Sequence, residues 1–269
     1  MDDLGEQPPA CWICGAPADS AEHRIKKADL VRVYGKGPYR GDAAPVHIRG
    51  GVQTSIQGPG SAAVKYRPSL CQRCNTTATQ PYDRAYDQLI SWVVANESAV
   101  LRKRLIDFGE VYGSSFEEEQ RNLFKYFVKN IGCRLVDARE SVPRDLVELL
   151  PRETFRTKLA ITFCVNEDIL LLPAWRSDFI GKGELLAFSA HDNPTIATSY
   201  QWNEHVSWFT VYYWYGRPPD GGLGPKWIAD AQFIYLGSSS PLTPEQRADL
   251  IAKVAEDESD ANSKCGAGS

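Results

Sequence analysis

The sequence predicts an α+β protein, in which a small zinc-bound N-terminal module precedes helices and a mixed or antiparallel β-sheet domain. Two observations carry this prediction. Two Cys-x-x-Cys pairs lie within residues 1–78, a region rich in Gly and Pro. Apolar residues then recur with a helical period to about residue 150, and with a strand period from Phe155 onward. A chain of 269 residues is long enough for one large or two modest domains.

The N-terminal module is expected over residues 1–110, with little regular structure before its trailing helix. Stretches 34–45 and 51–61 are turn-forming. We expect the extended pieces 46–50 and 62–67 to pair as a hairpin across the second of these stretches. A bound metal ion commonly compensates for a small core in units below roughly 80 residues.

Helices are predicted from apolar spacing and from capping residues. The first starts near Asn75 or Thr79 and runs to about Phe108. The second spans 115–132, where Ser115 and Glu118 form a capping box and Gly132 follows the last apolar residue. A short third helix is expected over 142–150, and a last helix opens at Thr243, with Pro244 at its first position and Gln246 completing the box.

The strands belong to a C-terminal α+β domain expected over 111–257, which a polar, disordered tail follows over 258–269. In the segment 206–215 both alternating faces are apolar, which is typical of a central strand covered on both sides. Enrichment in Val, Ile, Phe, Tyr and Trp predicts five strands, namely 158–165, 169–175, 184–190, 206–215 and 231–237.

The cysteines indicate a metal site. The chain has seven cysteines, and four of them form the pairs Cys11/Cys14 and Cys71/Cys74. An odd count with paired spacing, in a chain that shows no secretory leader, favours metal binding over disulfides. Each pair can place two thiolates on one turn, so the four together suit a tetrahedral Zn²⁺. A closed four-cysteine site is structural, since it leaves no open coordination position.

Three side chains beside these cysteines are candidate functional residues. Glu22 and His23 follow the first pair, and Asn75 directly follows the second. A zinc ion that joins the two pairs could bring these side chains toward one another. Asp83 and Asp87 lie further along the same helix and are interpreted as solvated carboxylates.

The stretches "CWICG", "AEHRIKKADL" and "LCQRCN" together resemble the HNH endonucleases of the ββα-metal fold, in the branch with flanking zinc-binding CxxC pairs. The resemblance covers the N-terminal third only. It implies that Glu22 and Asn75 hold a catalytic Mg²⁺ or Mn²⁺ and that His23 is the general base. It further implies hydrolysis of phosphodiester bonds in nucleic acid, most simply DNA, in a bacterial or phage defence or mobile-element setting.

An alternative function stays open. The family carries a middle Asn shortly before its second CxxC pair, and no Asn lies between His23 and Cys74 here. The module could therefore be a non-catalytic zinc-dependent element that binds nucleic acid or protein. The C-terminal domain would then act as a sensor for a regulatory ligand or protein.

Charge and hydropathy exclude several classes of protein. The formal net charge is −4, so the chain is no polybasic nucleic-acid binder. No apolar run reaches the length of a membrane span, and the acidic N-terminus lacks a leader. These features predict a cytoplasmic protein with no membrane partner. Neither the DNA sequence preference nor the oligomeric state follows from the sequence.

Overall fold

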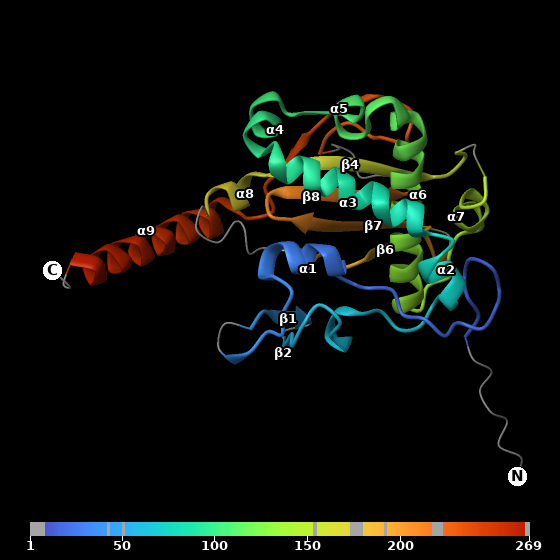
Figure 1. Ribbon diagram of the computed structural model, residues 1–269, viewed down its shortest axis with the longest axis horizontal. Helices are drawn as coiled ribbons and strands as arrows, with labels where there is room; N and C mark the ends of the chain where they lie inside the picture. Colours follow the sequence, from blue (N-terminus) through green and yellow to red (C-terminus); the bar gives the residue numbers. More distant parts are fainter. Residues whose placement is uncertain are drawn as a thin grey trace, which may run out of the picture.

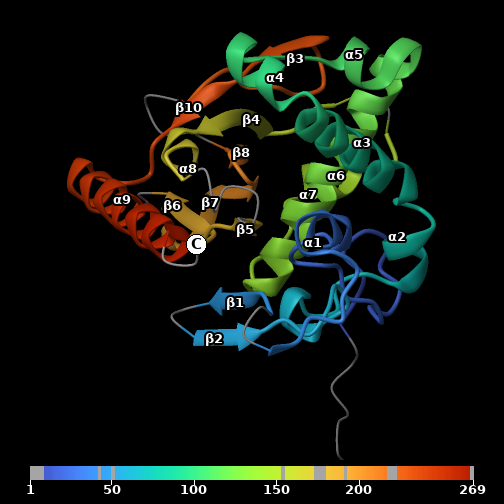
Figure 2. The same ribbon diagram turned by 60° about the vertical axis from the view of Figure 1, so that its left-hand side comes forward.

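A computed structural model describes residues 9–41, 44–49, 52–152, 155–172, 180–190, 193–216 and 223–266. It is a mixed α+β structure, as the sequence predicts. Figures 1 and 2 show a central sheet with α3 and α6 on one face, while the N-terminal module lies beside the C-terminal part of α6. Helix α9 projects away from the rest of the molecule (Figure 1).

The main sheet has the order β10-β4-β8-β7-β5, and β6 also pairs with β7. Strand β10 is parallel to β4 and the other pairs are antiparallel, so the sheet is mixed. All seven residues of β8 are buried, which confirms a central strand within the segment 206–215. The strands are β4 (Leu159–Asn166), β5 (Ile180–Lys182), β6 (Leu186–Ala190), β7 (Asn193–Val206), β8 (Phe209–Tyr215) and β10 (Gly237–Ser239).

Three of the five strand predictions were wrong in detail. The segment 206–215 is not one strand, because a tight turn at Ser207, where φ is +52°, pairs Val206 with Phe209. The long strand β7, which precedes this turn, was not predicted. The segment predicted as a strand over 169–175 begins instead within helix α8 (Glu167–Leu170), where the Asn166 side chain accepts two backbone N–H groups. Residues 173–175 lie outside the described part of the chain.

The segment 231–237 forms two short strands rather than one. Strand β9 (Phe233–Tyr235) pairs with β3 (Leu105–Asp107), and β10 starts at Gly237. Strand β3 also shows that the first predicted helix is too long. That region divides into α3 (Gln80–Ala95) and α4 (Glu97–Lys103), and Arg104 ends α4 in the left-handed region at φ +51°.

Helix α6 (Phe116–Asp137) continues past Gly132, the residue expected to end it. The Ser115 side chain makes no capping hydrogen bond, so the predicted box is absent. Two short helical segments, α5 (Phe108–Tyr112) and η3 (Gly113–Ser115), precede α6. Helix α7 (Arg144–Leu149) confirms the short third helix.

Helix α9 (Pro244–Gly266) confirms the last predicted helix and its capping box. The Gln246 backbone N–H donates to Thr243 Oγ1 over 3.2 Å, and the Thr243 N–H donates to Gln246 Oε1 over 2.9 Å. The helix extends to Gly266, through most of the region predicted to be a disordered tail.

The N-terminal module contains α1 (Lys27–Tyr34), β1 (Val46–Arg49), β2 (Val52–Ser55), η2 (Ala62–Val64) and α2 (Gln72–Thr76). The predicted hairpin is wrong, because β1 pairs with β2 and not with 62–67. The Ser61 side chain instead caps the turn η2, and the following residues pair with the segment around His23.

The core lies between the sheet and helices α3 and α6. Phe127 on α6 contacts rings from both sides, since it packs edge-on against Tyr86 of α3 and against Tyr213 of β8. Trp227 is fully buried and joins the same group through Phe124 and Phe163. Helix α6 is therefore held in place on the sheet, and its C-terminal half can position the N-terminal module that packs against it.

Candidate metal centre and functional site

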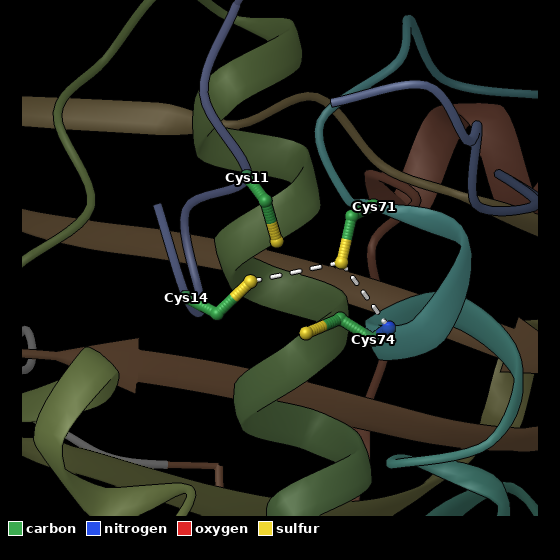
Figure 3. Close-up of side chains that lie close together, drawn as sticks. All are labelled: Cys11, Cys14, Cys71 and Cys74. Atoms are coloured by element: carbon green, nitrogen blue, oxygen red, sulfur yellow. Dashed lines mark hydrogen bonds between the residues drawn. The ribbon is translucent and has the colours of Figure 1, made fainter. Parts of the chain in front are cut away.

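Cys11, Cys14, Cys71 and Cys74 come together from two segments that are distant in the sequence. Their sulfur atoms point toward a common centre (Figure 3) and all lie within 4.8 Å of one another. The Cys14 and Cys71 Sγ atoms are 3.6 Å apart. Four thiolates at tetrahedral positions, with Zn–S bonds near 2.3 Å, require sulfur separations of this order. The cluster therefore fits one structural Zn²⁺.

Local backbone geometry forms each half of the cluster. In the first half, Gly15 adopts φ +78° and donates its N–H to the Cys11 carbonyl over 2.8 Å, which closes a tight turn. A residue with a side chain rarely adopts this conformation, so glycine suits the position after Cys14. In the second half, Cys71 caps α2, and its Sγ accepts the Cys74 N–H over 3.5 Å.

The protonation of these thiols depends on their burial. Burial raises the pKa of Cys11 and of Cys74. Hydrogen bonds, first from the Ala16 backbone N–H and then from the other thiols of the cluster, lower the pKa of the exposed Cys14 thiol to about 7. Zinc binds thiolates, so loading the site releases protons and couples metal binding to folding of the module.

The cysteine cluster is seated on helix α6. Trp12, which lies between the first two cysteines, packs its ring over Gly132: a Cβ atom placed on Gly132 would come within 2.4 Å of Trp12 Cζ2. Cys133 is fully buried in the same apolar cluster as Cys11, Tyr66, Leu70 and Cys74. Gly132 therefore does not end the helix but allows Trp12 to approach it.

The segment that carries Glu22 and His23 runs antiparallel to residues 64–70. Bridges join Ser20 to Leu70 and His23 to Lys65, and the Tyr66 N–H donates to the Glu22 carbonyl over 2.9 Å. Helix α2, with Asn75, follows directly. The chain therefore runs through two paired extended segments and then into a helix, around the cysteine cluster.

Glu22 turns toward helix α6. Its Oε2 atom lies 2.7 Å from the ammonium of Lys129, and its Oε1 accepts the His23 backbone N–H over 3.0 Å. Lys129 is 1% exposed and also contacts Asp83 Oδ2 at 2.9 Å. Burial alone would lower the pKa of Lys129, but the carboxylates of Glu22 and Asp83 raise it, so the ammonium stays charged.

His23 is half-buried. Burial lowers the pKa of its imidazole, while nearby Glu22 raises it and the ammonium groups of Lys65 and Lys27 lower it. The net shift is downward, so the ring is neutral at neutral pH. Its Nε2 atom is buried and has no hydrogen-bond partner within the chain.

Asn75 supplies a second unpaired atom. Its Nδ2 donates to Ser20 Oγ over 2.8 Å, whereas its Oδ1 is buried without a partner within the chain. An unpaired buried amide oxygen is costly, and a cation or a donor from a ligand would satisfy it.

The structure thus brings the four cysteines together, but it leaves the three other predicted residues in separate settings. Glu22 is bound to Lys129, His23 faces Lys65, and Asn75 is held by Ser20. Elsewhere among the described residues, no three His, Cys, Asp or Glu ligand atoms gather at metal-binding distance. Sequence analysis missed Lys129 because its apolar neighbours give no sign of a buried charge. It interpreted Asp83 as solvated, although Asp83 bonds both Lys129 and Lys26.

Comparisons with family models, curated proteins and solved structures give no match to this chain. The geometry alone therefore defines the site. In the described part of the chain, every helix is too short or too polar to cross a lipid bilayer.

Proposed function

We propose that the protein is a metal-dependent endonuclease that hydrolyses phosphodiester bonds of nucleic acid, with DNA as the favoured substrate. One observation carries the proposal. A half-buried, neutral histidine with an unpaired nitrogen lies on the first of two paired segments, and the helix that follows them begins at the cysteine cluster. This order of elements is the one that the resemblance to HNH endonucleases implies.

In this proposal His23 is the general base. A neutral imidazole can accept a proton from an attacking water at physiological pH, and the lowered pKa keeps it in that form. The unpaired Nε2 is the atom that would take the proton, and because it is buried, a water must first gain access to it. Lys65 and Lys27, which lie close enough to lower this pKa, would attract the phosphate backbone to the same segment.

The proposed catalytic Mg²⁺ or Mn²⁺ fits the residues only in part. Asn75 Oδ1 is an unpaired oxygen of the kind that hard cations prefer. Both carboxylate oxygens of Glu22 are engaged by protein donors, and the Lys129 ammonium already provides a positive charge there. A divalent ion at Glu22 would therefore have to displace Lys129, and we derive no catalytic step through it.

The test is cleavage of supercoiled plasmid by the purified protein with Mg²⁺, Mn²⁺ or EDTA. We expect cleavage that EDTA abolishes, and a loss of about 10²–10⁴-fold in His23→Ala and His23→Gln. The glutamine variant keeps a polar side chain, so it separates loss of the base from loss of packing. Glu118→Gln, on the exposed first turn of α6, serves as the control. Full activity in both His23 variants would contradict the proposal.

The ion pair between Glu22 and Lys129 favours a second candidate. A carboxylate whose oxygens are already bonded is a structural group, so the module would bind nucleic acid or protein without cutting. This candidate predicts a shift of labelled DNA in a gel, no cleavage with any divalent ion, and unchanged binding in His23→Gln.

A further inference from the structure

A cavity of about 390 Å³ lies between the N-terminal module and the C-terminal sheet. Its walls come from the His23 segment, from β1 and α1 of the module, and from α6, β5 and β7 of the body. The volume lies within the roughly 300–1,000 Å³ of small-molecule sites. Neither Glu22, His23 nor Asn75 lines it, so it is separate from the proposed catalytic residues.

One wall of the cavity is cationic. Arg24 and Arg134 are 8% and 7% exposed, and the side chain of Lys182 is 10% exposed. Lys182 is neutralised by Glu204, whose Oε2 lies 2.7 Å from its Nζ. Burial lowers the pKa of Lys182 and this carboxylate raises it.

The two arginines share their counter-ion. Asp137 Oδ2 lies 2.9 Å from Arg24 Nη2 and 3.7 Å from Arg134 Nη1, and Arg67 also approaches this carboxylate at 4.0 Å. Arg134 has one further acidic partner, Glu184, whose side chain is 78% exposed. One buried carboxylate thus faces two buried guanidinium groups, while the third, on Arg67, has a side chain that is 44% exposed. The two buried arginines therefore carry more positive charge than the one buried carboxylate balances. Such charge is costly unless an anion compensates it.

Hydrogen-bond donors without partners also indicate that an anion binds here. Tyr66 is 3% exposed and lines the cavity, yet its hydroxyl has no hydrogen-bond partner within the chain. Arg24 Nε is likewise buried and unpaired, and the Arg24 guanidinium lies 4.7 Å from the centre of the Tyr66 ring. Burial raises the pKa of Tyr66 well above its usual value, so the hydroxyl keeps its proton. Both atoms are buried beside the cavity, so a small movement of either side chain would let it donate to an anionic oxygen.

The remaining wall is apolar. Ile25, Leu30 and Ile56 form a buried cluster against which Ile180 packs, and all four line the cavity. From β1, Val46 and Ile48 reach the same space and are 50% and 63% exposed. A mainly apolar lining with a few polar groups is the usual composition of a small-molecule site.

We propose that this cavity binds a small organic anion that joins a phosphate or carboxylate group to a flat, largely apolar ring. The anionic group accepts hydrogen bonds from Arg24 and Tyr66 near Arg134, and the ring lies against Ile25, Ile56 and Ile180. Because Arg24 belongs to the module and Arg134 to the body, the occupant connects the two. Binding is independent of whether the module cleaves nucleic acid.

The experiment measures binding by isothermal titration calorimetry and by thermal shift in zinc-loaded protein. The probes are AMP and benzoate, each with its neutral counterpart, adenosine or benzamide, and inorganic phosphate. We expect a ring-bearing anion to bind and to raise the melting temperature, and its neutral counterpart to bind at least about ten-fold more weakly. AMP separates a phosphate site from the carboxylate site that benzoate reports.

Tyr66→Phe is the decisive variant because it removes only the hydroxyl. We expect it to weaken binding of the anion about ten-fold, while the melting temperature of the ligand-free protein stays unchanged or rises. Arg24→Gln should weaken binding further, and Arg144→Gln, whose side chain is 91% exposed in the natural protein, is the charge-matched control. The proposal is overturned if neither anion binds at millimolar concentration. It also fails if Tyr66→Phe destabilises the ligand-free protein and leaves binding intact. In that case a bound water, and not a ligand, would be the hydrogen-bond partner of the hydroxyl.

Discussion

Substituting Gly132 with alanine tests how the cysteine cluster is seated on α6. A Cβ atom at this position would lie 2.4 Å from Trp12 Cζ2 and 2.7 Å from two further atoms of the ring. Carbon atoms normally stay about 3.5–4.0 Å apart, so the rigid indole must move. Overpacking of this kind costs roughly 1–3 kcal/mol, whereas alanine in a helix interior stabilises by about 1 kcal/mol relative to glycine. We expect Gly132→Ala to lower the free energy of unfolding by about 0–2 kcal/mol.

The sign should reverse when the ring is removed. In a Trp12→Ala background the added methyl group meets no indole, so Gly132→Ala should raise the free energy of unfolding by about 1 kcal/mol. Urea denaturation of the four proteins, followed by circular dichroism in excess zinc, measures the coupling. If Gly132→Ala stabilised the natural protein as much as the Trp12→Ala variant, Trp12 would not rest on the helix and the reasoning would be refuted.

Three further predictions concern metal, buried charge and pH. Cys71→Ser should reduce bound zinc from one ion per chain to none and loosen the module, which elemental analysis and limited proteolysis would show. Lys129→Met should destabilise the protein by about 3–5 kcal/mol in urea denaturation, because Glu22 and Asp83 lose a buried cation. Burial raises the pKa of Asp29 to about 6, so its contribution to the free energy of unfolding should decline by about 2–3 kcal/mol between about pH 4 and 6. Asp29→Asn should remove that decline.

The sign of the pH effect follows from linkage. A carboxyl whose pKa is higher in the folded than in the unfolded state stabilises the fold while protonated, and this stabilisation is lost as pH rises through the folded value. Groups such as Asp83, Asp145 and Glu167, whose pKa values are lowered on balance by their partners, act in the opposite direction. The comparison of Asp29→Asn with the natural protein therefore isolates the one group. An unchanged pH profile in the variant would contradict the assignment.

Local signals in the sequence predicted local features well. The CxxC spacing predicted the four-cysteine cluster, because each pair needs only one turn of backbone. Thr243 and Gln246 predicted the start of α9, since a capping box depends on residues three apart. The same signal failed at Ser115, where the chain enters α6 from another short helical segment and the serine is not extended.

Features that depend on distant residues could not be predicted in this way. The turn at Ser207 follows from pairing of β7 with β8, and the apolar residues on both sides of this single serine give no turn signal. Gly132 looked like a helix end because glycine often follows the last residue of a helix. The structure shows that glycine is needed there to make room for the Trp12 ring, which comes from a distant part of the sequence. The partners of Lys129 are likewise remote, and no spacing rule connects them. Glu22 is therefore paired with Lys129, whereas the local motif suggested that it binds a metal ion.

The charges on α6 limit how the N-terminal module could be reused. Lys129 bonds Glu22 and Asp83, and Asp137 bonds Arg24, so residues outside the module neutralise Glu22 and Arg24, whereas Asp83 also pairs with Lys26 inside it. A chimera that joined residues 9–95 to a different scaffold would leave the Glu22 carboxylate and the Arg24 guanidinium without these partners, and Asp83 with Lys26 alone of its two lysines. The module is thus not a portable unit in the way that an independent zinc finger is. A successful transplant would have to bring α6 with it.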